Sequence, residues 1–338
     1  MIREAIARLV DNHPLTQEEA QSAMREIMAG EASPAQISSF ITALRIRGET
    51  AEVIAGCARA MRERFTAVDA RAELVVDTCG TGGDGMQTFN ISTTAALVAA
   101  GAGVRVAKHG NRGVSSRSGS ADVLAALGVR VDAPPAVMEA CLREIGIAFL
   151  FAPALHPAMK HAIGPRRDIG IRTVFNILGP LSNPAGARHG VMGVYQPELV
   201  PIVAHAAAEL GAERLFVVHG HDGLDEITLT DRTAVAEVAA GRVRLFEWSP
   251  EEVGLPRCRP EDLKGGSPEE NAALTRAILD GAAGPRRDIV LLNAAAAILA
   301  AGRAGDLREG VALAAAAIDD GRARGKLNAL IARTQLAT

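Results

Sequence analysis

The sequence predicts an α/β fold class: a small all-helical N-terminal domain followed by a larger α/β domain with a mostly parallel central sheet flanked by helices. The chain has 338 residues, which is more than one hydrophobic core usually serves, so two domains are expected. The first 65 residues carry helix signals and no strand signal. From about residue 72, strand-like and helix-like segments alternate, which is typical of right-handed crossovers in a parallel sheet.

The N-terminal segment contains three sites that favour the start of a helix. Thr16 and Glu19 have the spacing of a capping box, in which each side chain bonds the backbone N–H of the other residue. Ser33, followed by proline, begins a second helix, and Thr50 caps a third. These signals predict a bundle of short helices.

The remainder of the chain predicts a sheet with helical connections. "VRVAKHG" and "RLFVVHG" are two of its strand-like runs. We expect strands over 73–78, 104–110, 147–152 and 214–220, two short antiparallel strands within 226–248 that turn near Gly241, and a return to strand and helix from 286 onward.

Residues 156–186 do not fit this alternation. The segment is rich in proline and glycine and has no clean period, yet its apolar content argues against disorder. We expect it to pack back toward the helical domain and to shape a cleft between the two domains. The predicted division is therefore a helical domain over 1–68, completed by about 155–182, and an α/β domain over 69–338.

Composition excludes several classes of protein. The formal net charge of −3 argues against a nucleic-acid binder dominated by phosphate contacts. The four cysteines form no C-x-x-C pair, which makes structural zinc or a disulfide framework improbable. The first ten residues do not resemble a signal peptide, and the most apolar segment is too short to span a bilayer. We expect a soluble, cytoplasmic protein with no membrane partner.

Four glycines between residues 80 and 85, in "DTCGTGGDGMQTFNISTTAAL" (77–97), raise the question of a phosphate site. They follow a predicted strand and precede a predicted helix, where ligands bind in open α/β sheets. Glycines let a backbone approach an anion closely, and a helix N-terminus offers free N–H groups. Further donors come from Thr88, Asn90, Ser92 and Thr93. The alternative is a tight turn with a Ser/Thr cap. The loop is not a Walker A motif, because no lysine follows the glycines.

A second polar loop, "KHGNRGVSSRSGSAD" (108–122), follows the next predicted strand. It supplies positive charge from Lys108, His109, Arg112 and Arg117, together with several serines and glycines. Loops that follow successive parallel strands lie side by side, so the two loops together predict a site for a highly phosphorylated ligand. We assign His109 no proton-transfer role, because a lone histidine in such a loop is more often structural.

Asp225 and Glu226, in "HGHDGLDEI" (219–227), follow another predicted strand. Neighbouring carboxylates are usually a solvated turn, but a phosphate site needs a counter-ion, and hard oxygen ligands suit Mg²⁺. As neighbours, the two groups can each serve a different ion. His219 and His221 suggest zinc only weakly, since no cysteine or H-E-x-x-H spacing accompanies them.

Arg166 and Arg167 lie in the irregular segment, within "GPRRDIG". They are either surface charges, paired for instance with Asp168, or one of them grips a carboxylate through its planar guanidinium.

Six motifs, in order and spacing, resemble the anthranilate phosphoribosyltransferase family: "GTGGD", "FNIST", "KHGNR", "SGSADVL", "RTVFNILGPLSNP" and "HGHDGLDEI". The resemblance covers nearly the whole chain. It implies the fold shared with pyrimidine nucleoside phosphorylases and a homodimer joined through helices. It also implies transfer of phosphoribose from 5-phosphoribosyl-1-pyrophosphate (PRPP) to the amine of anthranilate, with Mg²⁺ and release of pyrophosphate, in tryptophan biosynthesis.

The resemblance also implies roles for individual residues. The metal, up to two Mg²⁺ ions per subunit, would be held by Ser92, Asp225 and Glu226. Anthranilate would contact Gly80, Asn111 and Arg166, with His109 lining its path. No residue would be an essential acid or base, and Lys108, Asn90 and His109 would act electrostatically. The residues around PRPP would be Gly80, Gly83, Asp84, Thr88, Asn90, Ile91, Ser92, Thr93, Lys108, His109, Gly110, Asn111, Arg112, Gly113, Val114, Ser115, Ser116 and Ser120.

Two alternatives remain open from the sequence. A nucleoside phosphorylase-like enzyme on the same fold would cleave a glycosidic bond with phosphate, although the Asp225–Glu226 pair and the long basic loop favour a pyrophosphate leaving group. A non-catalytic relative that binds nucleic acid would need a basic face, which a chain with 36 basic and 39 acidic residues does not favour.

Overall fold

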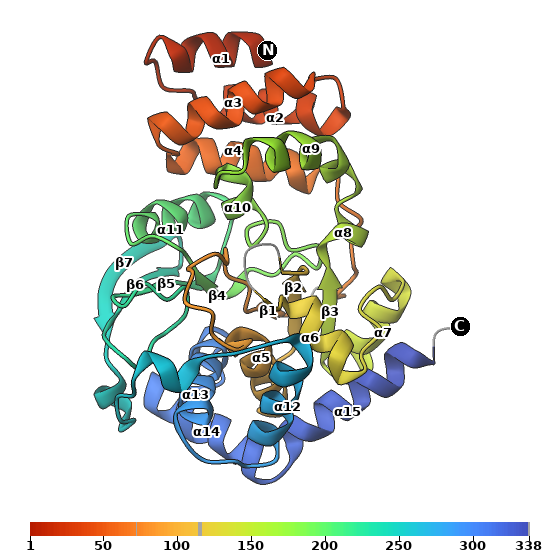
Figure 1. Ribbon diagram of the computed structural model, residues 1–338, viewed down its shortest axis with the longest axis vertical. Coiled ribbons are helices and arrows are strands. Elements are labelled where there is room, and N and C mark those ends of the chain that lie inside the picture. The colour runs from red at the N-terminus through yellow and green to blue at the C-terminus, as the bar shows by residue number, and fades with distance from the viewer. Residues whose placement is uncertain (72, 114–116, 337–338) are drawn as a thin grey trace.

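The computed structural model describes residues 1–71, 73–113 and 117–336. A layer of helices from the N-terminal part of the chain lies above one sheet, and the C-terminal helices lie below it (Figure 1). Among the described residues, no helix combines the length and apolar character needed to cross a membrane. The predicted fold class, a helical N-terminal domain with a larger, mostly parallel α/β domain, is confirmed.

Of the four N-terminal helices, three begin where their caps predict, whereas α1 has no side-chain cap. Thr16 Oγ1 accepts a hydrogen bond from the N–H of Glu19 at 3.2 Å, and the Glu19 carboxylate accepts from the N–H of Thr16 at 2.8 Å, completing the capping box. Ser33 forms the same arrangement, and Thr50 caps its helix through the N–H of Val53. The bounds are α1 Ile2–Val10, α2 Gln17–Ala29, α3 Pro34–Arg47 and α4 Ala51–Arg62.

The sheet has seven strands in the order β3-β2-β1-β4-β5-β6-β7. The pairs from β3 to β5 are parallel, and β5-β6 and β6-β7 are antiparallel. β4 was not predicted from the sequence, since its run "HGVMG" contains two glycines. The bounds are β1 Val76–Asp77, β2 Val106–Gly110, β3 Ile147–Phe151, β4 His189–Gly193, β5 Arg214–Gly220, β6 Thr233–Ala239 and β7 Arg242–Trp248.

The antiparallel end confirms the predicted turn near Gly241. Ala240 and Gly241 have φ values of 49° and 73°, and two successive positive φ values are characteristic of the tight hairpin turn between β6 and β7. Residues 226–232, included in the predicted antiparallel region, are a loop instead. Their backbone N–H groups bond side chains rather than a neighbouring strand, as at Ile227 and Thr228.

Helices cover both faces of the sheet. On one face α11 packs against β5, β6 and β7, and on the other α13 packs against β4 and β5. The return to a strand expected at residue 286 is wrong, because Pro285 begins one continuous alanine-rich helix. The bounds are α5 Ile91–Gly101, α6 Ser120–Leu127, α7 Pro135–Glu144, α11 Leu199–Glu209, α12 Pro268–Leu279, α13 Pro285–Ala300, α14 Leu307–Asp319 and α15 Arg322–Gln335.

The segment 156–186 is more regular than its sequence predicted. It contains α9 (Lys160–Ile169), which keeps Pro165 inside the helix, and α10 (Val174–Leu178), after the short α8 (Ala152–Leu155). α9 packs against α2 and α3, so tertiary contacts outweigh the local preference against helix. The segment therefore packs against the N-terminal helices, as expected.

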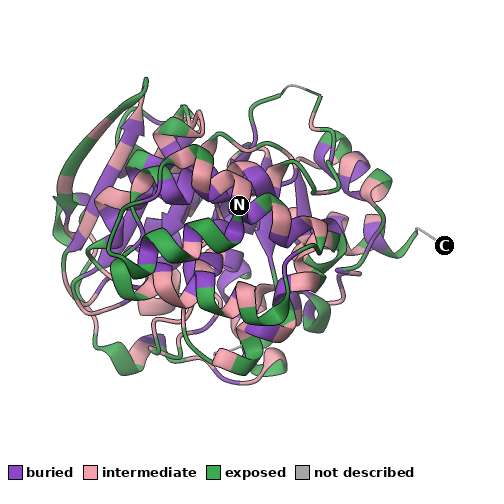
Figure 2. Ribbon diagram, turned by 90° about the horizontal axis from the view of Figure 1, so that it is seen from above, coloured by how far each residue is buried: buried purple, intermediate pink, exposed green. Residues whose placement is uncertain are grey.

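Two hydrophobic clusters hold the molecule together, and strand alternation divides the sheet between them. Met192 and Val217 face the cluster that includes the N-terminal helices and α11, whereas Val191 and Phe216 face the cluster under α5 and α13. Figure 2 shows the buried residues concentrated in the central strands and in the helix faces that cover them. Since the first cluster runs from α1 into the sheet, the predicted domain boundary at 68/69 stays a prediction.

Candidate active site

Three loops meet where the parallel strands end. We call residues 78–90, after β1, the glycine loop; residues 111–119, after β2, the basic loop; and residues 221–232, after β5, the acidic loop. Because β1 pairs with β2 and with β4, and β4 pairs with β5, all with parallel direction, these loops leave the same edge of the sheet. The glycine loop and the basic loop are therefore neighbours, as the sequence predicted.

The glycine loop is built against the acidic loop. The N–H of Gly82 donates to Asp225 Oδ2 at 2.7 Å. A Cβ atom on Gly80 would lie 3.0 Å from the same oxygen and 3.2 Å from the carbonyl oxygen of Gly193, so a larger residue would force these neighbours to move. Gly83 has a φ of 80°, a conformation that side chains disfavour. The glycines thus allow close contact within the protein as well as approach to a ligand.

Asn90 joins the glycine loop to the basic loop. Its amide nitrogen donates to the carbonyl oxygen of Ser118 at 3.0 Å, and its amide oxygen accepts from the Ser118 hydroxyl at 3.2 Å and from Asn271 at 3.0 Å. The sequence analysis offered this amide as a donor to phosphate, but here it holds the two loops together. Thr93 is 2% exposed, so its side chain is covered by protein.

Lys108 is a buried cation at the end of β2. Its side chain is 4% exposed, and Nζ donates to the carbonyl oxygen of Thr78 at 2.8 Å and lies 3.5 Å from Ser92 Oγ. Its charge acts to lower the pKa values of Asp77 and Glu226. Lys108 and Ser92 are therefore brought together beside the acidic loop.

The three acidic side chains Asp84, Asp225 and Glu226 crowd together opposite Lys108. The Asp225 N–H donates to Asp84 Oδ2 at 3.4 Å, and the Ser92 N–H donates to Glu226 Oε1 at 3.1 Å. Burial, followed by the charges of Asp84 and Glu226, raises the pKa of Asp225 well above its ordinary value. Burial likewise raises the pKa of Glu226 to about 7, with Lys108 opposing the shift. A set of hard carboxylate oxygens that repel one another fits a divalent cation such as Mg²⁺.

His109 forms a buried pair with His156. Its Nδ1 lies 3.1 Å from the carbonyl oxygen of Gly179, which can only accept, so Nδ1 carries the proton. The remaining nitrogen, Nε2, then accepts from His156 Nε2 at 3.2 Å. Burial lowers the pKa of His109 to about 3 and that of His156 to about 4. Both rings are neutral at physiological pH, and the sequence analysis missed His156.

Asp77 is a buried carboxylate at the end of β1. It accepts from the N–H of His109 at 3.1 Å and from the Asn183 amide at 2.7 Å. Burial raises the pKa of Asp77 to about 6. The sequence analysis assigned no role to Asp77 or Asn183. In the sequence, these two residues stand out only as a carboxylate and an amide within otherwise apolar or irregular segments.

The described part of the basic loop is held by Asp122, the first acidic residue of α6. The Asp122 carboxylate accepts from Arg112 at 3.0 Å, from the N–H of Gly113 at 2.8 Å and from the N–H of Gly119 at 2.9 Å. Asn111 is exposed, and its carbonyl oxygen accepts from the Ser120 hydroxyl at 3.3 Å. The predicted site residues Val114, Ser115 and Ser116 lie outside the described residues.

The two arginines of interest in 156–186 have different surroundings. The Arg166 guanidinium lies over the Phe175 ring, 5.1 Å from its centre, and burial lowers its pKa. Within the described ranges, no hydrogen bond or ion pair links Arg166 to the glycine loop. Arg172, which the sequence analysis did not single out, stacks on the Tyr195 ring at 4.5 Å, and its Nη2 would lie 3.1 Å from a Cβ on Gly83.

Comparison with known proteins places this architecture in a family. Residues 3–65 match the helical bundle domain of the glycosyl transferase family, and residues 72–324 match its a/b domain. The chain is 55% identical over 332 residues to the anthranilate phosphoribosyltransferase of Moorella thermoacetica, covering 98% of each chain.

Solved structures agree with this match. The anthranilate phosphoribosyltransferase (TrpD) of Thermus thermophilus is 48% identical, with a TM-score of 0.93 over 98% of this chain and 99% of that one. The Saccharomyces cerevisiae protein in complex with PRPP and Mg is 30% identical, with a TM-score of 0.90 over 99% and 98%. Another structure of the yeast protein is in complex with 4-fluoroanthranilate, at 29% identity and a TM-score of 0.89 over 99% and 98%.

Proposed function

The chain belongs to the anthranilate phosphoribosyltransferase family, and we propose that it transfers the 5-phosphoribosyl group of PRPP to the amine of anthranilate in tryptophan biosynthesis. The products are N-(5-phosphoribosyl)anthranilate and pyrophosphate. The observation that carries the proposal is the convergence of the glycine loop, Lys108 and the Asp225–Glu226 pair at one edge of the sheet. The family match supports this activity over the nucleoside phosphorylase and nucleic-acid-binding alternatives.

PRPP is assigned to the glycine loop and the basic loop. α5 begins at Ile91 beside the glycine loop, so the positive end of its dipole favours an anion there, and Lys108 supplies a buried positive charge. The full set proposed to surround PRPP is the one that the family resemblance implies, from Gly80 to Ser120.

Mg²⁺ is assigned to Ser92, Asp225 and Glu226, one or two ions per subunit. Bound there, it would offset the negative charge of the pyrophosphate group. Two features of the chain favour this set: the carboxylates repel one another at the edge of the sheet, and Ser92 contacts both Glu226 and Lys108.

Anthranilate is assigned to Gly80, Asn111 and Arg166, with His109 beside its path. A planar guanidinium suits a carboxylate ligand, because it can donate two parallel hydrogen bonds. Arg166 is partly buried, which makes such a contact stronger than it would be in water.

The proposed mechanism needs no proton carrier in the protein. The aromatic amine of anthranilate is weakly basic and unprotonated at pH 7, so it can attack C1 of the ribose directly, and the proton that its nitrogen then loses passes to water or to the released pyrophosphate. The demanding event is departure of pyrophosphate while positive charge develops at C1. Lys108 and the N–H groups of the glycine loop stabilise the leaving charge, and the site aligns amine and C1. The low pKa of His109, about 3, agrees with a positioning role for that ring.

Three broader features are proposed on the same basis. We infer a homodimer joined through the N-terminal helices, a cytoplasmic location, and a division into a helical domain and an α/β domain near residues 68/69. Exposed apolar side chains on the helices, such as Val10 and Ile46, are consistent with the dimer.

The activity is tested by following anthranilate fluorescence after mixing the purified protein with PRPP and Mg²⁺. We expect loss of fluorescence, release of an equal amount of pyrophosphate, and abolition of both by EDTA. No loss of fluorescence, despite measurable PRPP binding, would contradict the proposed acceptor and direct attention to other amines.

The anthranilate assignment is tested in the same assay with Arg166→Ala. We expect the KM for anthranilate to rise at least about tenfold, because a charge-assisted bidentate contact contributes roughly 1.5–3 kcal/mol, while the KM for PRPP stays unchanged. Arg167→Ala is the matched control, since Arg167 is the next residue and its side chain is 80% exposed. A rise confined to the KM for PRPP would show that Arg166 is wrongly placed.

A further inference from the structure

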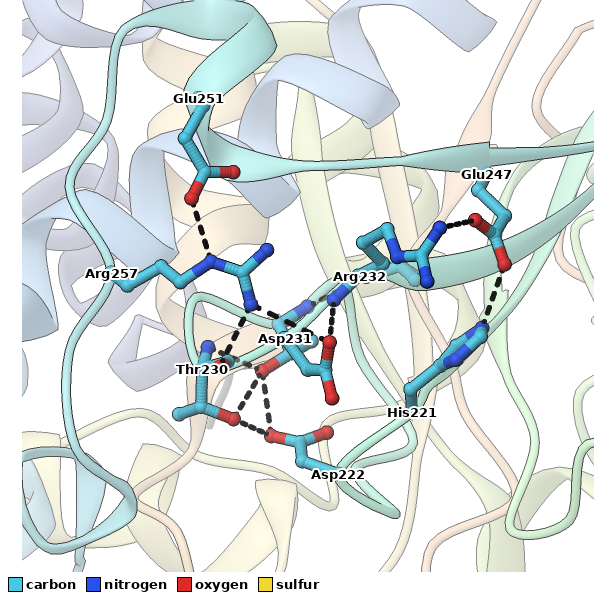
Figure 3. A network of polar contacts seen from close by, with 10 residues as sticks. His221, Asp222, Thr230, Asp231, Arg232, Glu247, Glu251 and Arg257 are labelled. Atoms are coloured by element: carbon cyan, nitrogen blue, oxygen red, sulfur yellow. Dashed lines mark hydrogen bonds and ion pairs between the residues drawn. The ribbon is translucent and has the colours of Figure 1, made fainter.

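Asp222 lies three residues before the Asp225–Glu226 pair, and its carboxylate is the centre of the acidic loop. Asp222 Oδ2 accepts from the Thr228 hydroxyl at 2.7 Å and from the Thr230 hydroxyl, and Oδ1 accepts from the N–H of Leu224 at 3.2 Å. Figure 3 shows Asp222 and Thr230 at the base of this network. The Asp222 carboxylate therefore connects the residues of the acidic loop before the Asp225–Glu226 pair to the residues after it.

Backbone contacts close the loop around Asp222. The N–H of Gly220 donates to the carbonyl oxygen of Leu224 at 2.8 Å, and the N–H of His221 donates to that of Arg232 at 2.9 Å. A Cβ atom on Gly220 would lie 2.4 Å from Asp222 Oδ1, so glycine at this position leaves room for the carboxylate. The loop conformation thus depends on Asp222 lying inside it.

Asn293 of α13, a helix that covers one face of the sheet, holds the loop in place. Its amide oxygen accepts from the N–H of Ile227 at 3.0 Å, and its amide nitrogen donates to the carbonyl oxygen of Ile227 at 2.9 Å. Ile227 follows Glu226 directly, and Asn293 is only 3% exposed. The acidic pair is consequently held on both sides, by Asp222 and by Asn293.

The hydrogen bonds of Asp222 and Asn293 hold the acidic loop in place against electrostatic repulsion. When they are ionised, as a bound cation requires, Asp84, Asp225 and Glu226 carry like charges in a partly buried region, so their repulsion favours moving the loop outward. A site whose oxygens already occupy their places binds a cation without first ordering a loop, which strengthens binding. Because the ionised carboxylates repel one another, the acidic loop keeps this arrangement only if other groups hold it.

We propose that Asp222 is a positioning residue that sets the affinity of the acidic pair for its divalent cation, with Asn293 supporting it from α13. The inference rests on the proposed function in assigning the cation to Asp225 and Glu226. Asp222 itself bonds hydroxyls and a backbone N–H, so it acts through the loop and does not coordinate the ion.

The outer part of the same network provides a control. Asp231 accepts from its neighbour Arg232 and pairs with Arg257 at 3.4 Å, and Arg257 also pairs with Glu251 at 2.6 Å (Figure 3). Asp231 is in the same loop, but its side chain is 46% exposed and contacts neither Asp222 nor the acidic pair through any hydrogen bond in the described ranges. Exposed ion pairs contribute little.

The test compares Asp222→Asn with Asp231→Asn in the full-length protein, using Mn²⁺ as the probe. An asparagine has one acceptor atom and cannot serve the two threonine hydroxyls and the Leu224 N–H together. We expect the Kd for Mn²⁺, measured by electron paramagnetic resonance with PRPP present, to rise about tenfold in Asp222→Asn. The Mg²⁺ concentration for half-maximal activity should rise equally, with kcat recovered at saturating Mg²⁺. Asp231→Asn should match the unchanged protein in both.

Results that would overturn the inference can be told apart from failure of the proposed function. Equal Mn²⁺ affinity in Asp222→Asn and the unchanged protein, or a loss of kcat that high Mg²⁺ does not restore, would overturn the inference. If Asp222→Asn does not fold, Thr230→Val removes a single donor, and an unchanged Mn²⁺ affinity in that variant overturns it too. Failure of the proposed function would instead appear as an inactive unchanged protein, while the Mn²⁺ comparison would still decide the role of Asp222.

Discussion

Asp77, Lys108 and His109 are 7%, 4% and 3% exposed, whereas Asn111, Arg112 and Gly113, which begin two residues after His109, are exposed. The first group belongs to what we call the floor of the site: the ends of β1, β2 and β4 together with the acidic loop. The second belongs to the rim: residues 81–87 of the glycine loop and the described residues of the basic loop.

Floor and rim differ in how closely their atoms are packed. On the floor, side chains bond one another or the backbone, as Asp77 bonds Asn183 and His109 bonds His156. On the rim, Gly82 and Gly85 have φ values of 65° and 80°, and a Cβ on either would meet nothing within 4 Å. Buried polar contacts are concentrated on the floor, while Gly82 and Gly85 leave space on the rim for a phosphorylated ligand.

The largest effect is expected on the floor, from Gly193→Ala. A Cβ at residue 193 would lie 1.5 Å from the carbonyl oxygen of Asp225 and 2.5 Å from its carbonyl carbon. Because both obstacles are backbone atoms, β4 or the acidic loop must move. We expect the free energy of unfolding, measured with urea, to fall by about 4 kcal/mol and Mg²⁺-dependent activity to fall more than tenfold. A variant with the original midpoint and activity would refute a rigid floor.

A smaller effect is expected from acidification of the buried histidine pair. The pKa values of His109 and His156, about 3 and about 4, are below the ordinary 6.5, so folding favours the neutral rings. Their contribution is therefore present above pH 6.5 and is lost as the pH falls toward 4.

His156→Gln removes the part of this contribution that is due to His156, because glutamine keeps an N–H donor for His109 but does not titrate. Between pH 7 and pH 5 the unchanged protein should lose about 2 kcal/mol more unfolding free energy than the variant, since each unit of pKa shift is worth about 1.4 kcal/mol. Urea denaturation at both pH values measures the difference. Parallel losses in the two proteins would mean that the pair is not neutral when buried.

The rim and the helix caps were more predictable from sequence than the floor. Thr16, Ser33 and Thr50 act over three or four residues, and a cluster of glycines after a strand is a local pattern. Such signals need no knowledge of the rest of the fold. The parallel sheet also followed from alternation, even though β1 is only two residues long and β4 was not predicted.

The floor depends on pairs that are distant in sequence. Asn293 bonds Ile227 across 66 residues, and Asn183 bonds Asp77 across 106. Nothing near Asn293, in the run "LLNAAAA", indicates its partner, although one amide among buried apolar residues signals that a polar partner exists. The helix α9 was missed for a related reason, since packing on α2 and α3 stabilises a segment whose glycine and proline disfavour helix.

The smallest effect is expected on the rim, from Gly85→Ala. The residue is exposed, its φ is 80°, and a Cβ would contact nothing within 4 Å. The cost is then only that of a left-handed conformation in a residue with a side chain, about 1 kcal/mol. Urea denaturation should show that loss, and the KM for PRPP should change less than about threefold. Because Gly85→Ala and Gly193→Ala add the same methyl group, a loss in Gly85→Ala as large as in Gly193→Ala would remove the distinction between floor and rim.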